Sequence, residues 1–148
     1  MRRKILIGTG VVAAGVLATA TPAFAQDAAA AEVQVNLDNA YVLLSAVLVI
    51  LMQAGFALVE AGLTRAKSVA NIMMKNLMDF CAGALAFFAV GYAIAFGADG
   101  NDFFGLGGWF LGDGATQYGT LTVPVTFIFQ VAFAATAATI VSGAMAER

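Results

Sequence analysis

Long apolar runs separated by short polar segments dominate the sequence. Beyond an N-terminal apolar stretch, three runs extend over about residues 40–60, 69–96 and 121–146. At about 1.5 Å per residue in a helix, each run is long enough to cross a hydrocarbon core of about 30 Å. We therefore predict an all-α membrane protein with three transmembrane helices in residues 40–148.

The N-terminus has the pattern of an export signal. Positive charges at residues 2–4 precede an apolar stretch at 5–20, and small residues follow at 22–25, where a signal peptidase would cleave. We predict that residues 1–25 are a secretory signal peptide used in ordinary export, with an uncleaved membrane anchor as the alternative. Residues 26–39, which are short and Ala-rich, would then form a flexible exterior arm.

The charges in the two connecting loops predict an orientation. The loop at residues 60–67 carries Arg65 and Lys67, whereas residues 97–120 carry three aspartates and neither Lys nor Arg. The positive-inside rule places the first loop in the cytoplasm and the acidic loop outside. We therefore predict a multi-pass protein of the cell membrane, the bacterial inner membrane, with its mature N-terminus outside.

Composition excludes several classes of function. Hydrophobic residues make up 61% of the chain and the mean hydropathy is +0.90, which exclude a soluble domain. The chain has one cysteine, Cys81, and no histidine, so it lacks an internal disulfide, the commonest metal ligand and the commonest proton shuttle. No nucleophile–base pair or metal cluster is evident, so we expect neither an enzyme nor a cofactor.

Two ionisable residues lie inside a predicted span. Lys75 and Asp79 are four residues apart, so on a helix they share a face and can form an ion pair. Charged groups are costly inside a membrane and are therefore functional candidates. The residue pattern favours a structural role near the inner surface, with Glu60, Asn71 and Asn76 as possible partners, over a role in transport or proton movement.

Small residues are concentrated in the third run and occur at Gly83 and Gly91 in the second. In lipid, helices associate through close packing and hydrogen bonds, and small side chains let their backbones approach. We therefore expect the third helix to be surrounded by other helices. The members of this set in the third run are Ala132, Ala134, Ala135, Thr136, Ala137, Ala138, Thr139, Ser142, Gly143 and Ala144.

Three segments, in order, carry a resemblance to a known family. They are Gln53–Leu63 with Arg65 and Lys67, then Tyr92–Gly97 followed by Asn101-Asp102-Phe103-Phe104-Gly105, and last Phe129–Ala134 followed by a small-residue helix and Gly143-Ala144-Met145-Ala146-Glu147-Arg148. Together they resemble the first three membrane helices of the ammonium transporter (Amt/Mep/Rh) family, and the resemblance covers residues 38–148. It implies an eleven-helix fold in two inverted halves, a homotrimer with one pore per subunit, and channel-like uptake of ammonium or ammonia.

Phe129 and Phe133 are four residues apart, so on a helix they share a face. Aromatic rings attract small cations, although two such rings on a membrane helix can also simply pack. The resemblance implies that Phe129 belongs to the outer site that recruits ammonium and that Phe133 is one ring of the pore gate. It also implies that Phe56, Thr136 and Ile140 line the pore.

The resemblance implies that further parts of the site lie on later helices. These parts are the two pore histidines, the second gate phenylalanine and the recruitment tryptophan, for which Trp109 in the loop is no substitute. We therefore expect residues 1–148 to be the N-terminal part of a transporter and not to conduct alone. An ammonium sensor and a three-helix membrane assembly subunit remain the alternatives. The resemblance also implies a cytoplasmic PII-type signalling protein as a partner.

Overall fold

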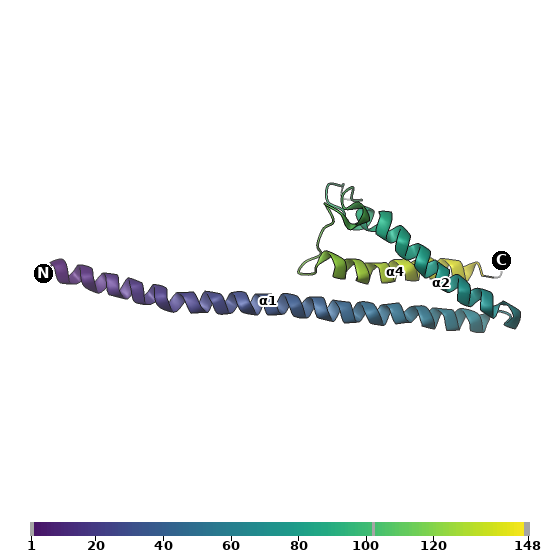
Figure 1. Ribbon diagram of the computed structural model, residues 1–148, viewed down its shortest axis with the longest axis horizontal. Coiled ribbons are helices and arrows are strands. Elements are labelled where there is room, and N and C mark those ends of the chain that lie inside the picture. The colour runs from purple at the N-terminus through teal and green to yellow at the C-terminus, as the bar shows by residue number, and fades with distance from the viewer. Residues whose placement is uncertain (1, 102, 147–148) are drawn as a thin grey trace. The chain divides into compact units, whose positions relative to one another are not determined.

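The computed structural model describes the backbone of residues 2–101 and 103–146, and the side chains of residues 27–101 and 103–146. Over these residues the fold is all-helical, as the sequence predicts (Figure 1). Asp102, Glu147 and Arg148, which belong to the segments that carry the resemblance, lie outside the described residues. The elements are α1 (Arg2–Leu63), η1 (Ala66–Ser68), α2 (Val69–Ala86), η2 (Phe87–Gly91), α3 (Tyr92–Phe96), η3 (Trp109–Leu111) and α4 (Val123–Ala144).

The chain divides into two units, residues up to Leu37 and residues Asp38–Arg148. The first unit is helical backbone within α1, including most of the segment that the sequence predicts as a flexible arm. Four consecutive alanines at residues 28–31 favour a helix there, because alanine has the highest helix propensity. The side chains of the predicted signal peptide lie outside the described residues, so its cleavage remains a prediction.

Among the described residues, three helical segments are long and apolar enough to cross a membrane. They are Asp27–Leu63, Ala66–Phe96 and Val123–Ala144. The prediction of three transmembrane helices is therefore confirmed. The last helix begins at Val123 because Thr122 is extended and Pro124, which lacks an N–H to donate, occupies the first turn.

The Asp38–Arg148 unit has two ends that differ in the length of their connecting loop. At the short-loop end Thr64–Ser68 joins α1 to α2, and the C-terminal turns of α4 contribute to it. At the long-loop end Gly97–Thr122 joins α3 to α4.

Helices α2 and α4 pack together through small side chains. A Cβ atom added to Gly83 on α2 would lie 3.5 Å from the Cα atom of Ala135 and 3.8 Å from the Cβ atom of Ala138, both on α4. Ala132 and Ala135 are fully buried, and Ile72 of α2 is buried as well. The small residues of the third run thus bring two backbones close together, as the sequence predicts.

The second span contains a π-helical turn, η2, between α2 and α3. The ring of Phe87 lies over Gly91, where an added Cβ atom would come within 2.6 Å of the ring. Phe87 stacks on Phe127 of α4 with ring centroids 6.0 Å apart and contacts Tyr92 edge-on at 6.1 Å. We call Phe87, Phe88, Tyr92 and Phe127 the aromatic cluster; it joins the second span to α4 near the long-loop end.

Candidate functional site

Phe129 and Phe133 are in contact on α4. Their ring centroids are 5.0 Å apart and the ring planes meet at 64°, an edge-to-face arrangement. Phe129 is half-buried, whereas Phe133 is 44% exposed. The electron-rich faces of such rings attract a cation or the edge of another ring. At the surface of this three-helix unit, the pair can therefore contact a cation or another aromatic ring.

Thr136 lies on a different face of α4 from the exposed surface of Phe133. It is only 8% exposed, and its hydroxyl donates to the carbonyl of Ala132 at 2.9 Å. The Nε2 atom of Gln53 on α1 donates to the same hydroxyl at 2.8 Å, and the hydroxyl of Thr139 donates to Gln53 Oε1 at 3.0 Å. Gln53 therefore joins α1 to α4 halfway along the spans, and Thr136 faces α1 here.

The other two predicted pore-lining residues lie apart from Thr136. Ile140 on α4 is 56% exposed. Phe56 on α1 is half-buried in a shallow groove formed with Met52, Gly55 and Val59 of its own helix. The structure thus brings together Phe129 and Phe133, leaves Ile140 and Phe56 at the surface, and buries Thr136.

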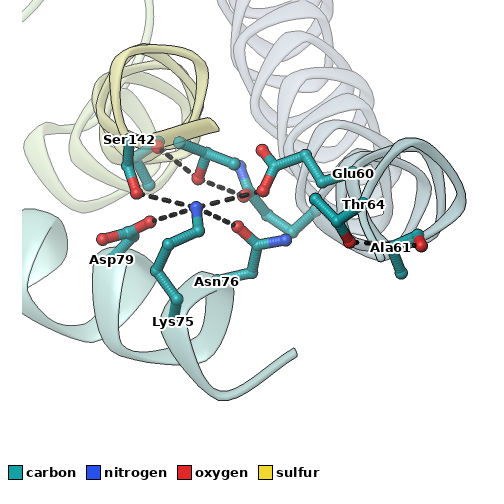
Figure 2. Close-up of polar contacts among 10 residues, drawn as sticks. Glu60, Ala61, Thr64, Lys75, Asn76, Asp79 and Ser142 are labelled. Carbon is teal, nitrogen blue, oxygen red and sulfur yellow. Dashed lines mark hydrogen bonds and ion pairs between the residues drawn. The ribbon is translucent and has the colours of Figure 1, made fainter. Parts of the chain in front are cut away.

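A charged cluster joins all three spans at the short-loop end. The Nζ atom of Lys75 on α2 lies 3.0 Å from Glu60 Oε2 on α1 and 3.1 Å from Asp79 Oδ2 (Figure 2). It also donates to Asn76 Oδ1 at 2.9 Å and to Ser142 Oγ on α4 at 2.7 Å. We call these four oxygen atoms the oxygen cage. The predicted pairing of Lys75 with Asp79 is confirmed, and so are Glu60 and Asn76 as partners; Asn71 is exposed.

The approach of Glu60 to α4 depends on a glycine. A Cβ atom added to Gly143 would lie 2.5 Å from Oε1 of Glu60 and 2.9 Å from its Cδ atom. The side chain of Glu60 is only 12% exposed, and its Oε2 contacts Lys75 as an ion pair without hydrogen-bond geometry. Gly143 therefore provides the space in which this carboxylate reaches the lysine.

A groove of about 250 Å³ lies between α1 and α2 beside the cage. Its lining is apolar except for Gln53 and Asn76. Asn76 is 5% exposed, and among the described residues its Nδ2 atom has no hydrogen-bond partner. The lining residues are Ile50, Gln53, Ala54, Ala57, Met73, Asn76, Leu77 and Phe80.

The long-loop end is joined to α1 by hydrogen bonds from Asp38 and Asn39 to the residues just before α4. Asn39 Oδ1 accepts from the backbone N–H of Thr122 at 2.9 Å and from its hydroxyl at 3.2 Å. Asn39 Nδ2 donates to the carbonyl of Thr120 at 3.2 Å, and the hydroxyl of Thr120 donates to Asp38 at 3.0 Å. These contacts fix the residue before the first turn of α4.

Sequence reasoning did not find the roles of three of these residues: Gln53 as the link to Thr136 and Thr139, Ser142 as part of the cage, and Gly143 as the space beside Glu60. A polar residue in an apolar run is a usable signal, because it needs a partner inside the membrane. Gln53 has that signal. A glycine among many small residues has none. Among the described residues, no three His, Cys, Asp or Glu side chains gather closely enough to hold a metal ion.

Three apolar helices with polar contacts between them inside the span define a multi-pass membrane protein. Residues 40–148 match the model of the Ammonium Transporter Family, so the chain belongs to this family. The predicted resemblance is confirmed. The family consists of transporters and not of enzymes, in agreement with the sequence prediction.

Several relatives have similar sequences. The chain is 54% identical over 115 residues to ammonium transporter Amt2 of Archaeoglobus fulgidus, covering 78% of this chain and 24% of that protein. It is 45% identical over 120 residues to putative ammonium transporter sll1017 of Synechocystis sp., covering 80% and 27%. It is 42% identical over 116 residues to putative ammonium transporter 1 of Caenorhabditis elegans, covering 76% and 20%. The chain thus spans about a quarter of the length of the curated relatives that it matches.

Proposed function

We propose that this chain supplies the first membrane helices of a transporter that carries ammonium or ammonia across the cell membrane. The match of residues 40–148 to the ammonium transporter family is the observation that carries this proposal. The names of the relatives above support the substrate, because each is called an ammonium transporter or a putative one. Since the chain spans about a quarter of their length, we also propose that these 148 residues do not conduct alone.

In this proposal Phe129 helps to recruit the cation at the outer side and Phe133 gates the pore. Their edge-to-face contact and the 44% exposure of Phe133 support these roles, since an exposed ring edge and face can meet a cation or a second ring. Phe56 and Ile140 line the pore from exposed or half-buried positions. Thr136 also lines the pore, but only with the part of its side chain that the hydrogen bond to Gln53 leaves accessible.

Uptake of labelled methylammonium tests the proposal. The variant Phe133→Ala is made in the full-length gene product and assayed in cells that lack other ammonium transporters. We expect the saturable uptake rate to change at least about fivefold, because about 1 kcal/mol of aromatic interaction at the gate is lost. The matched control is Val141→Ala, at an exposed position on the same helix. Equal rates in both variants would refute the role of Phe133, and a wild-type protein without uptake would refute the transport proposal.

The proposed orientation places the loop with Arg65 and Lys67 in the cytoplasm of a bacterial cell and the mature N-terminus outside. The short loop carries positive charge and the long loop does not, which supports this orientation. A cysteine introduced by Lys67→Cys in a Cys81→Ser background should react with a membrane-impermeant thiol reagent only after the cells are opened. Labelling in intact cells would contradict the proposed orientation and indicate the opposite one.

We propose a homotrimer as the assembled form and a PII-type protein as a cytoplasmic partner. The resemblance implies both, and the large apolar side chains exposed along α1, such as Leu44, Leu48 and Leu51, support association with further helices. Native mass measurement of the purified protein should give three copies per particle. Addition of a PII-type protein should raise that mass only if the second part of the proposal holds.

A further inference from the structure

We propose that the oxygen cage at the short-loop end is a binding site for an ammonium group, and that Lys75 is its covalently tethered occupant. On this view the cage is a cation site built from all three spans, separate from the aromatic pair of Phe129 and Phe133. Lys75 is a positioning residue that keeps the site filled. The inference does not depend on the proposed transport activity.

The geometry of the cage is that of a receptor for N–H donors. Its four oxygens lie 2.7–3.1 Å from the lysine nitrogen. Three of them accept hydrogen bonds from it, within the usual range of distances, and the fourth, Glu60 Oε2, makes an ion-pair contact without hydrogen-bond geometry. The oxygens come from α1, α2 and α4, so the cage exists only when the three helices are assembled. The lysine ammonium has three N–H donors, whereas a free ammonium ion has four. A free ion would therefore match the four acceptors at least as well.

The cage is also sheltered and negatively charged. The side chains of Lys75, Glu60 and Asp79 are 20%, 12% and 22% exposed. One ammonium group faces two carboxyl groups, and Gly143 makes the space in which Glu60 enters. If the lysine charge is removed, two carboxylates remain together inside a membrane span, where unpaired charge is costly. This arrangement would favour entry of a small cation with N–H groups.

A tether explains why a free cation does not occupy the wild-type cage. A group attached to the same helix competes at a high effective concentration, in the millimolar range or above for short flexible links. Lys75 therefore holds the cage closed to free ammonium while it joins the three helices.

Chemical rescue of Lys75→Met tests the inference. The variant is made in the full-length gene product and purified in mild detergent. Its thermal unfolding midpoint is then measured in ammonium, methylammonium or tetramethylammonium chloride at equal ionic strength. We expect the unfolding midpoint of the variant to lie below that of wild type. Ammonium and methylammonium should raise it by about 4 °C, since ligand binding stabilises the folded state. Tetramethylammonium, which has no N–H donor, should not raise it.

Two controls separate the cage from other effects. Wild-type protein and Lys67→Met, at an exposed position in η1, should show no comparable difference between the salts. The double variant Lys75→Met/Glu60→Gln removes one carboxylate, so it should lose most of the response to ammonium. A response in Lys75→Met no larger than in wild type, or equal in all three salts, would overturn the inference.

The single variant could fail to accumulate as folded protein. In that case the yield of folded protein after solubilisation in each salt is measured by size-exclusion chromatography. We expect ammonium or methylammonium to restore the yield at least twofold over tetramethylammonium. Equal yields would overturn the inference just as equal midpoints would.

Discussion

The two ends of the Asp38–Arg148 unit are held together by different forces. At the short-loop end, a lysine and four oxygen atoms join the spans, and Gly143 admits a carboxylate between them. At the long-loop end, aromatic rings join the second span to α4, and hydrogen bonds of Asn39 join α1 to the residue before α4. In lipid no hydrophobic force draws helices together, so either close packing or polar contacts must do so. The short-loop end relies mainly on polar contacts, and the long-loop end relies mainly on the packing of aromatic rings.

This difference has a structural consequence. A cage of directed contacts tolerates little change in the rotation or height of a helix, because each hydrogen bond weakens steeply as its angle departs from linear. Stacked and edge-on rings with centroids about 6 Å apart accept a wider range of geometries. We therefore expect the short-loop end to set the alignment of the helices and the long-loop end to contribute contact area.

The largest effect should follow from removing the central ring of the aromatic cluster. Phe127 contacts Phe87, Phe88 and Tyr92 at centroid distances of 5.9–6.0 Å. Phe127→Ala should lower the free energy of unfolding by about 2 kcal/mol, because a half-buried ring loses its packing contacts. Titration with a denaturing detergent would measure this change. Phe103→Ala, at a loop ring that is 94% exposed, is the control and should have almost no effect; equal losses would contradict the role of the cluster.

A smaller effect should follow from adding a methyl group at the short-loop end. Gly143→Ala should be less stable than Gly83→Ala by about 1 kcal/mol, although both changes give α-helices the same gain in propensity. The reason is that the new Cβ atom at residue 143 meets the carboxylate of Glu60, whereas the one at residue 83 makes ordinary contacts. The two variants are compared in the same detergent titration. Equal stability would mean that Glu60 adjusts freely and that the cage does not set the helix alignment.

The smallest effect should occur where α1 contacts the start of α4. Asn39→Ala removes the acceptor for the N–H and hydroxyl of Thr122, and should cost about 0.5–1 kcal/mol, as for the loss of a helix cap. Hydrogen exchange of the first amides of α4 would show the loss more directly than global unfolding. Asn71→Ala, at an exposed position on α2, serves as the control. No faster exchange at the start of α4 would refute the capping role.

Much of this fold could be predicted from the sequence, because the length of each apolar run determines how far a helix reaches across a membrane. The pairing of Lys75 with Asp79 was also predictable, since both lie on one helix at a spacing of four. Ser142 could not be assigned to the cage, because it is far from Lys75 in sequence and reaches it only through the packing of α4 on α2. Gly143 could not be assigned to the space beside Glu60 for the same reason, since α4 must first pack against α1. Such contacts depend on the rotation of α4 about its axis. The sequence does not determine this rotation, because apolar residues are spread evenly around the helix.

Thr136 shows the limit of predicting a helix face from spacing. At 100° per residue, it lies about 60° around α4 from Phe133, whereas Ile140 lies only about 20° away. The structure places Thr136 against Gln53, because a buried hydroxyl and amide satisfy each other there. Phe133 and Ile140 stay exposed. The resemblance implies a shared pore surface for all three, and in this unit the polar contact decides the orientation of Thr136.

The π-helical turn at Phe87–Gly91 is the place where the second span can lose a residue without changing the direction of its side chains. A π turn holds one residue more than an α-helical turn would. Removing that residue would restore uniform winding and leave Tyr92 and Phe96 in nearly the same direction relative to Lys75 and Asp79. Deleting a residue from the α-helical part after Asp79 would instead rotate the two groups by about 100° against each other, so the aromatic cluster and the oxygen cage could no longer both face α4. Deletions in this span are therefore expected to be tolerated best at the π turn.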